Sequence, residues 1–86
     1  MKTPIPVLYT KVGCPWCNEA RQVLVNSRVM FTEKNVSVDP AALAEMRRLS
    51  GQSKAPVLDW EGAVLADFGA DELKPFLAAR LTSVSR

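Results

Sequence analysis

The sequence has no histidine, only two cysteines and no long hydrophobic run. Without histidine, the chain lacks the commonest general acid–base side chain and cannot form a cysteine–histidine nucleophile pair. A zinc site normally takes four ligands, so two cysteines could not complete one without carboxylates or a second copy of the chain. We therefore expect no bound metal.

The apolar runs fall far short of the roughly 20 residues that span a bilayer, so we expect no membrane partner. The N-terminal residues Met1 to Pro4 carry no signal-peptide pattern, which leads us to expect a cytoplasmic protein. Net charge is only +2 and the basic residues are dispersed, so the chain offers no patch for nucleic acid. A length of 86 residues predicts one domain, residues 1–86, with a modest core.

The two cysteines stand close together in the segment Cys14-Pro15-Trp16-Cys17. The segment lies between a short apolar run and a stretch with helical periodicity, which predicts Cys14 at a helix N-terminus. There the unpaired N–H groups and the helix dipole favour a thiolate, the nucleophile of disulfide exchange. Neighbouring cysteines close almost no loop, so a purely structural disulfide would gain little stability. We favour a redox-active dithiol over an inert pair of thiols.

The rest of the pattern predicts the order β-α-β-α-β-β-α. Strand formers occupy ranges 5–9, 29–36, 55–58 and 63–66, and helical periodicity occupies 15–26, 40–50 and 71–81. The first βαβ unit implies a parallel pair with a right-handed crossover, and a turn at Glu61-Gly62 adds an antiparallel pair. We expect an α/β fold with a four-stranded mixed sheet flanked on both faces by three helices.

Individual residues set the helix boundaries and the buried faces. Asp39 and Pro40 are expected at the N-cap and first position of the second helix, and Gly51 at its C-terminal cap. Pro75 is expected near the first turn of the third helix. The residues predicted to face inward on these two helices are Ala42, Leu43, Met46, Leu49, Leu73, Phe76, Leu77 and Leu81.

Three motifs, in this order and at this spacing, resemble the glutaredoxin family of the thioredoxin superfamily, including its small bacterial glutaredoxin-like members. They are Tyr9-Thr10-Lys11-x-x-Cys14-Pro15-Trp16-Cys17, Gly51-Gln52-x-x-Ala55-Pro56 and Gly69-x-Asp71-Glu72-Leu73. The resemblance covers nearly the whole chain and implies a thioredoxin-like (glutaredoxin) fold. It also implies a thiol–disulfide oxidoreductase that reduces protein disulfides and protein–glutathione mixed disulfides, with glutathione as co-substrate.

The resemblance implies a role for each matching position near the cysteines. Cys14 matches the nucleophile and Cys17 the resolving cysteine of the family. Lys11 matches a lysine that pairs with a carboxylate of glutathione and helps to hold the thiolate. Trp16 matches the aromatic residue beside the site. The plainer alternatives are a solvated loop lysine for Lys11 and a core-packing residue for Trp16.

The remaining matches lie later in the chain. Pro56 matches a cis-proline that faces the cysteines, and Ala55 matches the residue whose backbone pairs with the cysteinyl part of glutathione. Asp71, with the backbone N–H groups of Gly69 and Ala70, matches the place that receives the γ-glutamyl end. The plainer alternatives are a trans proline at the start of a strand for Pro56 and a simple N-cap for Asp71.

Two departures from the family pattern leave the electron donor open. Lys54-Ala55-Pro56 stands where the family commonly has Thr-Val-Pro, and Phe68-Gly69 where it commonly has Gly-Gly. Phe68 resembles glutaredoxin-like redoxins that donate electrons to ribonucleotide reductase and are recharged by thioredoxin reductase. A third possibility is a carrier in which two copies share an iron–sulfur cluster through Cys14 and glutathione, which Pro15 disfavours. We expect a monomer.

Overall fold

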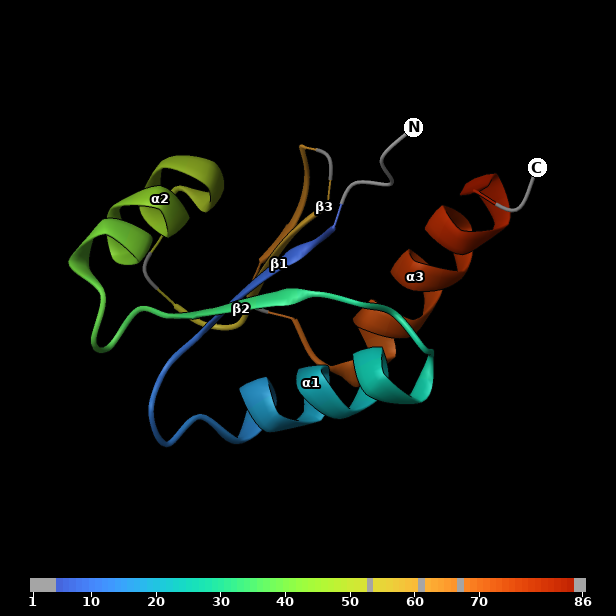
Figure 1. The fold of residues 1–86 in the computed structure, drawn as a ribbon, viewed down its shortest axis with the longest axis horizontal. Helices are drawn as coiled ribbons and strands as arrows, with labels where there is room; N and C mark the ends of the chain where they lie inside the picture. Colours follow the sequence, from blue (N-terminus) through green and yellow to red (C-terminus); the bar gives the residue numbers. More distant parts are fainter. Residues whose placement is uncertain (1–4, 53, 61, 67, 85–86) are drawn as a thin grey trace.

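A computed structural model of the chain describes residues 5–52, 54–60, 62–66 and 68–84 (Figure 1). The element order agrees with the prediction from the sequence. The strands and helices are β1 (Val7–Thr10), α1 (Pro15–Asn26), β2 (Thr32–Asn35), α2 (Pro40–Ser50), β3 (Val57–Trp60), β4 (Ala63–Ala66) and α3 (Ala70–Val84).

The strands form one mixed sheet in the order β2-β1-β3-β4, as expected. β1 runs parallel to β2 and antiparallel to β3, and β4 is antiparallel to β3. Leu8 in β1 lies opposite Glu33 in β2 and Leu58 in β3. β1 is a central strand, and the loop that leads to Cys14 leaves from its C-terminal end.

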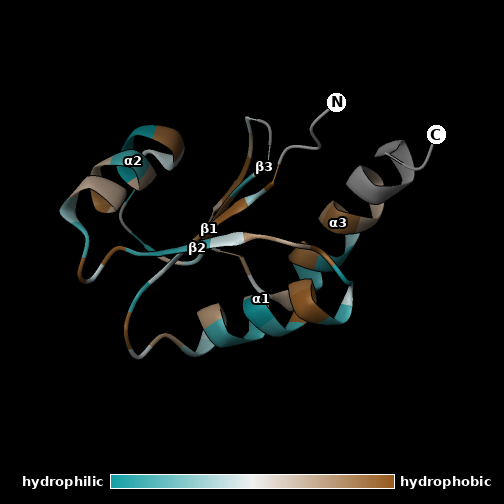
Figure 2. Ribbon diagram, in the orientation of Figure 1, coloured by the Kyte–Doolittle hydropathy of each residue, from teal (hydrophilic) through white to brown (hydrophobic). Residues whose placement is uncertain are grey.

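Helices cover both faces of this sheet. α1 and α3 contact each other on one face, while α2 contacts β3 and β4 on the other. Two buried clusters result, Leu8, Ala20, Leu24, Val29, Leu58, Trp60, Phe68, Leu73 and Leu77 on the first face and Tyr9, Val36, Ala42, Met46 and Val57 on the second. Figure 2 shows hydrophobic and hydrophilic residues alternating along α1 and α2, as expected for helices with one buried face.

Two strands begin later than expected, and proline is the reason. β1 begins at Val7 rather than at residue 5, and β3 begins at Val57 rather than at residue 55. Pro6 and Pro56 immediately precede these strands. Proline has no N–H to donate to a neighbouring strand, so strand pairing begins after it.

The prediction that the second strand opens at Val29 is wrong, because Val29 lies in the turn that ends α1. Arg28 has a positive φ of 58°. Its N–H donates to the carbonyl of Val25, and the N–H of Val29 donates to the carbonyl of Leu24, both at 3.0 Å. This pair of bonds is the Schellman helix ending, in which the apolar residue after the left-handed position packs back on the last turn. Val29 is therefore buried by helix termination, and β2 begins at Thr32.

The boundaries of α2 are confirmed. Asp39 is the N-cap and its carboxylate accepts from the N–H groups of Ala41 and Ala42. Gly51 ends the helix with φ 75°. The prediction of which residues face inward on α2 is only partly right, because Leu49 is 36% exposed. The buried cluster on this face ends one turn earlier, at Met46.

The expected start of α3 at Asp71 is one residue late. The carbonyl of Gly69 accepts from the N–H of Leu73 at 3.0 Å, so the helix begins at Ala70. Glu72 causes this shift, because its Oε1 accepts from the N–H of Gly69 at 2.6 Å and so closes half of a capping box. Pro75 is then the sixth helical residue rather than a first-turn residue, and it has no N–H to donate to a carbonyl one turn earlier.

The other expectations for the C-terminal half have mixed outcomes. Leu73 and Leu77 are buried and Phe76 packs against their cluster, whereas the side chain of Leu81 lies outside the described part of the chain. Gly62 takes a turn conformation with φ 85°, while Glu61 is not among the described residues. Within the described ranges, no helix has both the length and the apolar character needed to cross a membrane.

Candidate active site

A strand, a loop and a helix place the two cysteines. β1 ends at Thr10, and Gly13 in the following loop has φ 72°, a left-handed conformation that glycine adopts without steric cost. Cys14 is then the N-cap of α1, and Pro15 stands at the first helical position. Cys14 and Cys17 are joined in a disulfide with their Cα atoms 5.2 Å apart.

The two cysteines differ in exposure. Cys17 is buried, with 1% of its surface exposed, and Cys14 is partly exposed. Cys14 Sγ also accepts from the N–H of Cys17 at 3.1 Å, so the outer sulfur lies against the N-terminus of α1. This position can stabilise negative charge on Cys14 when the disulfide is reduced. An incoming group can therefore reach Cys14, while Cys17 is shielded by the fold.

Other residues expected at the site lie at the same end of the sheet, where β1 finishes. The N–H of Val36 donates to the carbonyl of Thr10 at 2.8 Å, which brings the end of β2 beside the end of β1. Tyr9 lies opposite Val57, so the residues before β3 also lie at this end. There the Ala55–Pro56 peptide bond is cis and Pro56 is buried. The cis geometry agrees with the expectation, and the binding roles of Ala55 and Pro56 stay predictions.

A pocket of about 480 Å³ opens beside Trp16. Its lining residues come from the first half of α1 and from the segment that begins α3, and they are Trp16, Glu19, Phe68, Gly69, Ala70, Asp71 and Glu72. Trp16 is 56% exposed, so it is not a core residue. A Cβ added at Gly69 would lie 3.3 Å from Glu72 Oε1 and 3.6 Å from Trp16 Cζ3, so these groups approach the Gly69 backbone closely.

The structure brings only some of the sequence-predicted binding residues together. Trp16, Gly69, Ala70 and Asp71 share the pocket, whereas Lys11 is exposed and is not among the lining residues. Asp71 lies in the first turn of α3 and is not its N-cap, so the plainer alternative for this residue is wrong.

Sequence reasoning missed two acidic residues of the pocket, Glu19 and Glu72. The spacing Gly69-x-x-Glu72 is a capping-box signal that could have indicated Glu72. Glu19 had no such signal, because its proximity to α3 depends on the packing of α1 against α3.

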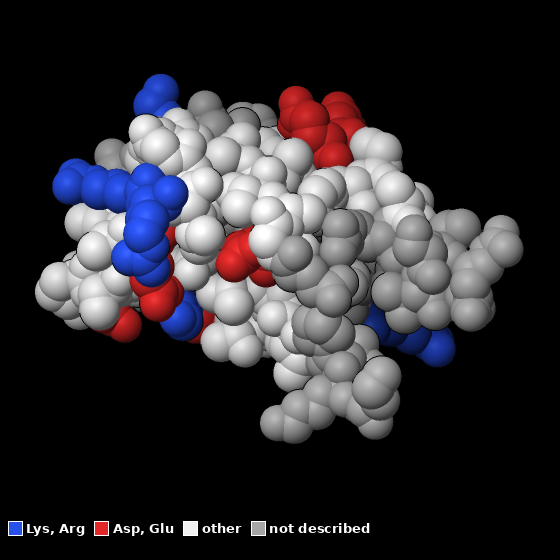
Figure 3. Space-filling model, turned by 90° about the horizontal axis from the view of Figure 1, so that it is seen from above, with Lys and Arg blue, Asp and Glu red and all other residues white. Residues whose placement is uncertain are grey.

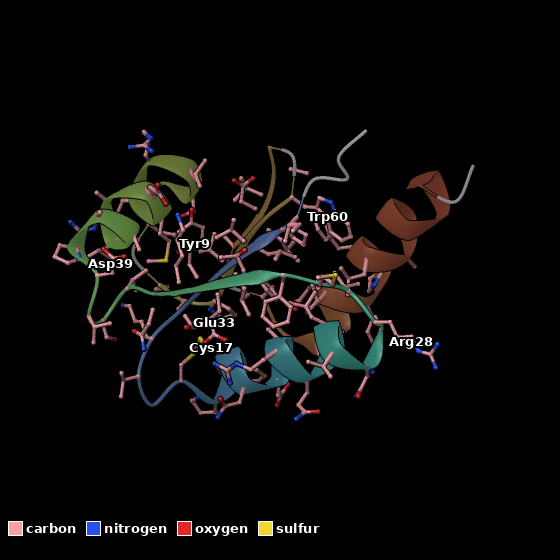
Figure 4. All side chains as sticks on the ribbon, viewed as in Figure 1. Tyr9, Cys17, Arg28, Glu33, Asp39 and Trp60 are labelled. Atoms are coloured by element: carbon pink, nitrogen blue, oxygen red, sulfur yellow. A yellow bond between two sulfur atoms is a disulfide. The ribbon has the colours of Figure 1, made fainter. Side chains whose placement is uncertain are left out.

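A polar network under the site ties α1 to the sheet. Thr10 is 1% exposed, and its hydroxyl donates to Glu33 Oε2 at 2.9 Å. Arg21 Nε donates to Glu33 Oε1 at 2.8 Å, and Arg21 Nη1 donates to Asn18 Oδ1 at 2.7 Å. The hydrogen bond from Arg21 lowers the pKa of the Glu33 carboxyl. Arg21 follows Cys17 by four residues on α1, so the network borders the helix face that carries the buried cysteine; Figure 4 labels Glu33 and Cys17.

A second network lies on the opposite face of the sheet. The Tyr9 hydroxyl donates to Glu45 Oε1 at 3.0 Å, and Lys34 Nζ donates to the same oxygen at 2.8 Å. Burial, and then the hydrogen bond to Glu45, raise the pKa of Tyr9 to about 12. Tyr9 points toward α2 in Figure 4, away from the cysteines, so this network joins α2 to the sheet.

The charges around the site are unevenly distributed. Figure 3 shows a group of basic side chains on the side of α2, whose last turn contains Arg47 and Arg48. In the ranges that the structure describes, the pocket beside Trp16 is lined by three acidic residues and by no basic residue. In the part of the chain that the structure describes, no three cysteine, histidine or acidic residues are grouped as metal ligands.

Comparisons with known proteins agree with this geometry. Residues 7–64 match the glutaredoxin family model. An uncharacterised glutaredoxin-like 8.6 kDa protein in a rubredoxin operon of Clostridium pasteurianum is 33% identical over 66 residues, which are 77% of this chain and 88% of the relative. A glutaredoxin of Pseudomonas aeruginosa is 34% identical over 70 residues, 81% of each chain. The solution structure of a glutaredoxin from Brucella melitensis has a TM-score of 0.71 and 27% identity, covering 98% of this chain and 90% of that one. The chain therefore belongs to the glutaredoxin family.

Proposed function

We propose that the protein reduces protein disulfides by a dithiol cycle of Cys14 and Cys17. The Cys14 thiolate attacks one sulfur of the substrate disulfide, whose S–S bond breaks and releases the other sulfur as a thiolate. The thiolate of Cys17 then attacks Cys14 Sγ, which closes the Cys14–Cys17 disulfide and releases the second substrate sulfur, and protons from solvent complete both thiols. Two electrons pass to the substrate, and the protein ends in the oxidised state that the structure contains.

The observation that carries this proposal is the asymmetry of the cysteine pair. The partly exposed Cys14 stands at the N-cap of α1 and its sulfur accepts an N–H bond, and the buried Cys17 lies one helical turn behind it. The N-terminus of a helix lowers the cost of a thiolate, so Cys14 is suited both to attack and to leave. The shielded Cys17 can react only with a partner already attached to Cys14.

Glutathione is the reductant that we propose first, and protein–glutathione mixed disulfides would be substrates by the same attack. Support comes from the family and from the pocket beside Trp16, where Gly69, Ala70 and Asp71 occupy the matching positions. A volume of about 480 Å³ lies in the range of small-molecule sites. In this scheme two glutathione molecules become glutathione disulfide as Cys14–Cys17 is reduced.

A flavoprotein reductase of the thioredoxin reductase class is the second candidate donor. Two observations favour it: Glu72 already occupies the N–H of Gly69, and Phe68 is 4% exposed in the core where the family commonly has a glycine. Both features alter the part of the pocket that would receive the γ-glutamyl carboxylate of glutathione.

A steady-state assay distinguishes the two donors. Reduction of insulin disulfides is followed by NADPH consumption with glutathione and glutathione reductase, and in parallel with thioredoxin reductase alone. Turnover in the first system supports glutathione, and turnover only in the second supports the reductase. Failure in both, with reduced protein also unable to cleave a protein disulfide, would contradict the proposed activity. We further propose that the protein acts as a cytoplasmic monomer.

A further inference from the structure

The pocket beside Trp16 is the part of the active site that can select a substrate. We call it the acidic pocket, with the lining residues Trp16, Glu19, Phe68, Gly69, Ala70, Asp71 and Glu72. We propose that the acidic pocket selects protein disulfides flanked by lysine or arginine. This inference rests on the proposed function and names the substrate class of the same site.

The charge of the acidic pocket is opposite to that of the whole chain. Three of its lining residues are carboxylates, Glu19, Asp71 and Glu72, and all three are exposed. Among the described residues, no lysine or arginine lines the pocket, although the whole chain has a formal net charge of +2. A local excess of negative charge beside the reactive sulfur attracts cationic segments and repels anionic ones.

The carboxylates reach the acidic pocket from two helices and share it with the exposed indole of Trp16. Glu19 lies three residues after Trp16 on α1, so the two side chains are neighbours on the helix surface. Asp71 and Glu72 approach from the first turn of α3. A substrate segment lying over Trp16 therefore meets negative charge from two helices. The indole face is itself a favourable contact for a lysine or arginine side chain.

The N-terminus of α3, which would otherwise attract an anion, is already partly neutralised. Glu72 Oε1 accepts from the N–H of Gly69 at 2.6 Å, so an incoming carboxylate would have to displace an internal one. A cationic side chain faces no such competition. The same feature that weakens the site for acidic ligands therefore adds to its preference for basic ones.

The test uses three peptides with the same Cys-x-x-Cys disulfide, flanked on each side by Lys-Lys, Gln-Gln or Glu-Glu. Fully reduced protein is mixed with each peptide, quenched with acid, and the single-turnover rate constant is read from the reduced peptide by chromatography. We expect the Lys-Lys peptide to react about tenfold faster than the Glu-Glu peptide at low salt, because several weak exposed ion pairs act together. The ratio should fall toward one at about 1 M salt, where screening is nearly complete.

Charge-neutralising variants locate the effect. The combination Glu19→Gln, Asp71→Asn and Glu72→Gln should reduce the Lys-Lys to Glu-Glu ratio to about twofold. Asp59→Asn is a charge-removal control outside the acidic pocket, because Asp59 pairs with Val7 at the opposite end of the sheet from Cys14. Asparagine can keep the bond that Asp59 accepts from the N–H of Gly62 at 3.1 Å. We expect Asp59→Asn to leave the ratio unchanged.

The outcomes separate this inference from the function on which it rests. Equal rates for the Lys-Lys and Glu-Glu peptides, or an unchanged ratio in the triple variant, would overturn the role of the acidic pocket. If the Gln-Gln peptide is reduced at the same time, the dithiol function stands. If reduced protein cleaves none of the three peptides, the proposed function fails and the inference fails with it.

Discussion

At the scale of single residues, the two bonded cysteines are not equivalent. Because Cys14 is partly exposed and Cys17 is 1% exposed, we infer that Cys14 makes the first attack on a substrate. We expect Cys14→Ser to lose all activity. We expect Cys17→Ser to keep the removal of glutathione from glutathionylated proteins and to lose most reduction of protein disulfides. Glutathionylated albumin and insulin are suitable substrates for measuring the two activities.

Both variants should fold, because serine is similar in size to cysteine. Circular dichroism and the midpoint of urea unfolding would confirm this. Retained activity in Cys14→Ser, or full insulin reduction by Cys17→Ser, would show that the assigned order of attack is wrong.

Arg28 is strained, and removing the strain should stabilise the protein. Its φ of 58° belongs to the left-handed region, which favours glycine at this position of a Schellman ending. We expect Arg28→Gly to raise the free energy of unfolding by about 0.5–1 kcal/mol, measured by urea denaturation. Arg28→Ala is the matched control, since alanine removes the side chain but keeps the Cβ. A gain of equal size in Arg28→Ala would attribute the effect to the arginine side chain instead.

At the scale of elements, the start of α3 depends on Glu72. Because its carboxylate bonds to the N–H of Gly69, Glu72→Ala should lower the free energy of unfolding by about 1 kcal/mol. Glutamine can make the same bond, so Glu72→Gln should cost less than about half of that. Urea denaturation of both variants tests this, and an equal loss in the two would assign the effect to charge rather than to capping.

The hydrogen bonds that join β1, β2 and α1 through Glu33 should stabilise the protein to an extent that depends on pH. The pKa of Glu33 is lowered in the folded protein, first by the hydrogen bond from Arg21. Its contribution to stability is therefore present above the unfolded pKa, near 4.5, and is lost as pH falls through the lower folded value. We expect the loss to be under about 1 kcal/mol, because the pair is partly exposed.

Glu33→Gln isolates this contribution. Free energies of unfolding measured from pH 7 down to about pH 3 should fall more steeply in the wild type than in the variant. Parallel curves would show that the carboxylates responsible for acid sensitivity lie elsewhere.

At the scale of the whole molecule, local patterns predicted the element order and the mixed sheet. Asp39 and Gly51 carry capping signals that act within one turn, so the boundaries of α2 could be read from the sequence. Val29 was misplaced because an apolar residue after a helix looks the same whether a strand or a Schellman ending buries it. Leu49 was misplaced because the periodicity of a helix does not show where its contact with the sheet ends.

At the site, too, features local in the sequence could be predicted and features that depend on the folded chain could not. Cys14 and Cys17 lie in one segment, so a redox-active dithiol could be predicted from their spacing and from their position before a helical stretch. The acidic pocket could not be predicted, because it joins Glu19 and Glu72 from two helices that meet only in the folded chain.

The oligomeric state gives the last test, because it separates a dithiol enzyme from a cluster carrier. A shared iron–sulfur cluster would need Cys14 of two copies and a glutathione on each side. Pro15, which disfavours such a carrier, stands at the first helical position beside Cys14. We expect a monomer by sedimentation, whether reduced, oxidised or incubated with glutathione. Anaerobically purified protein that is dimeric and absorbs visible light would support the carrier instead, since a cluster bound by thiolates is coloured and bridges the two chains.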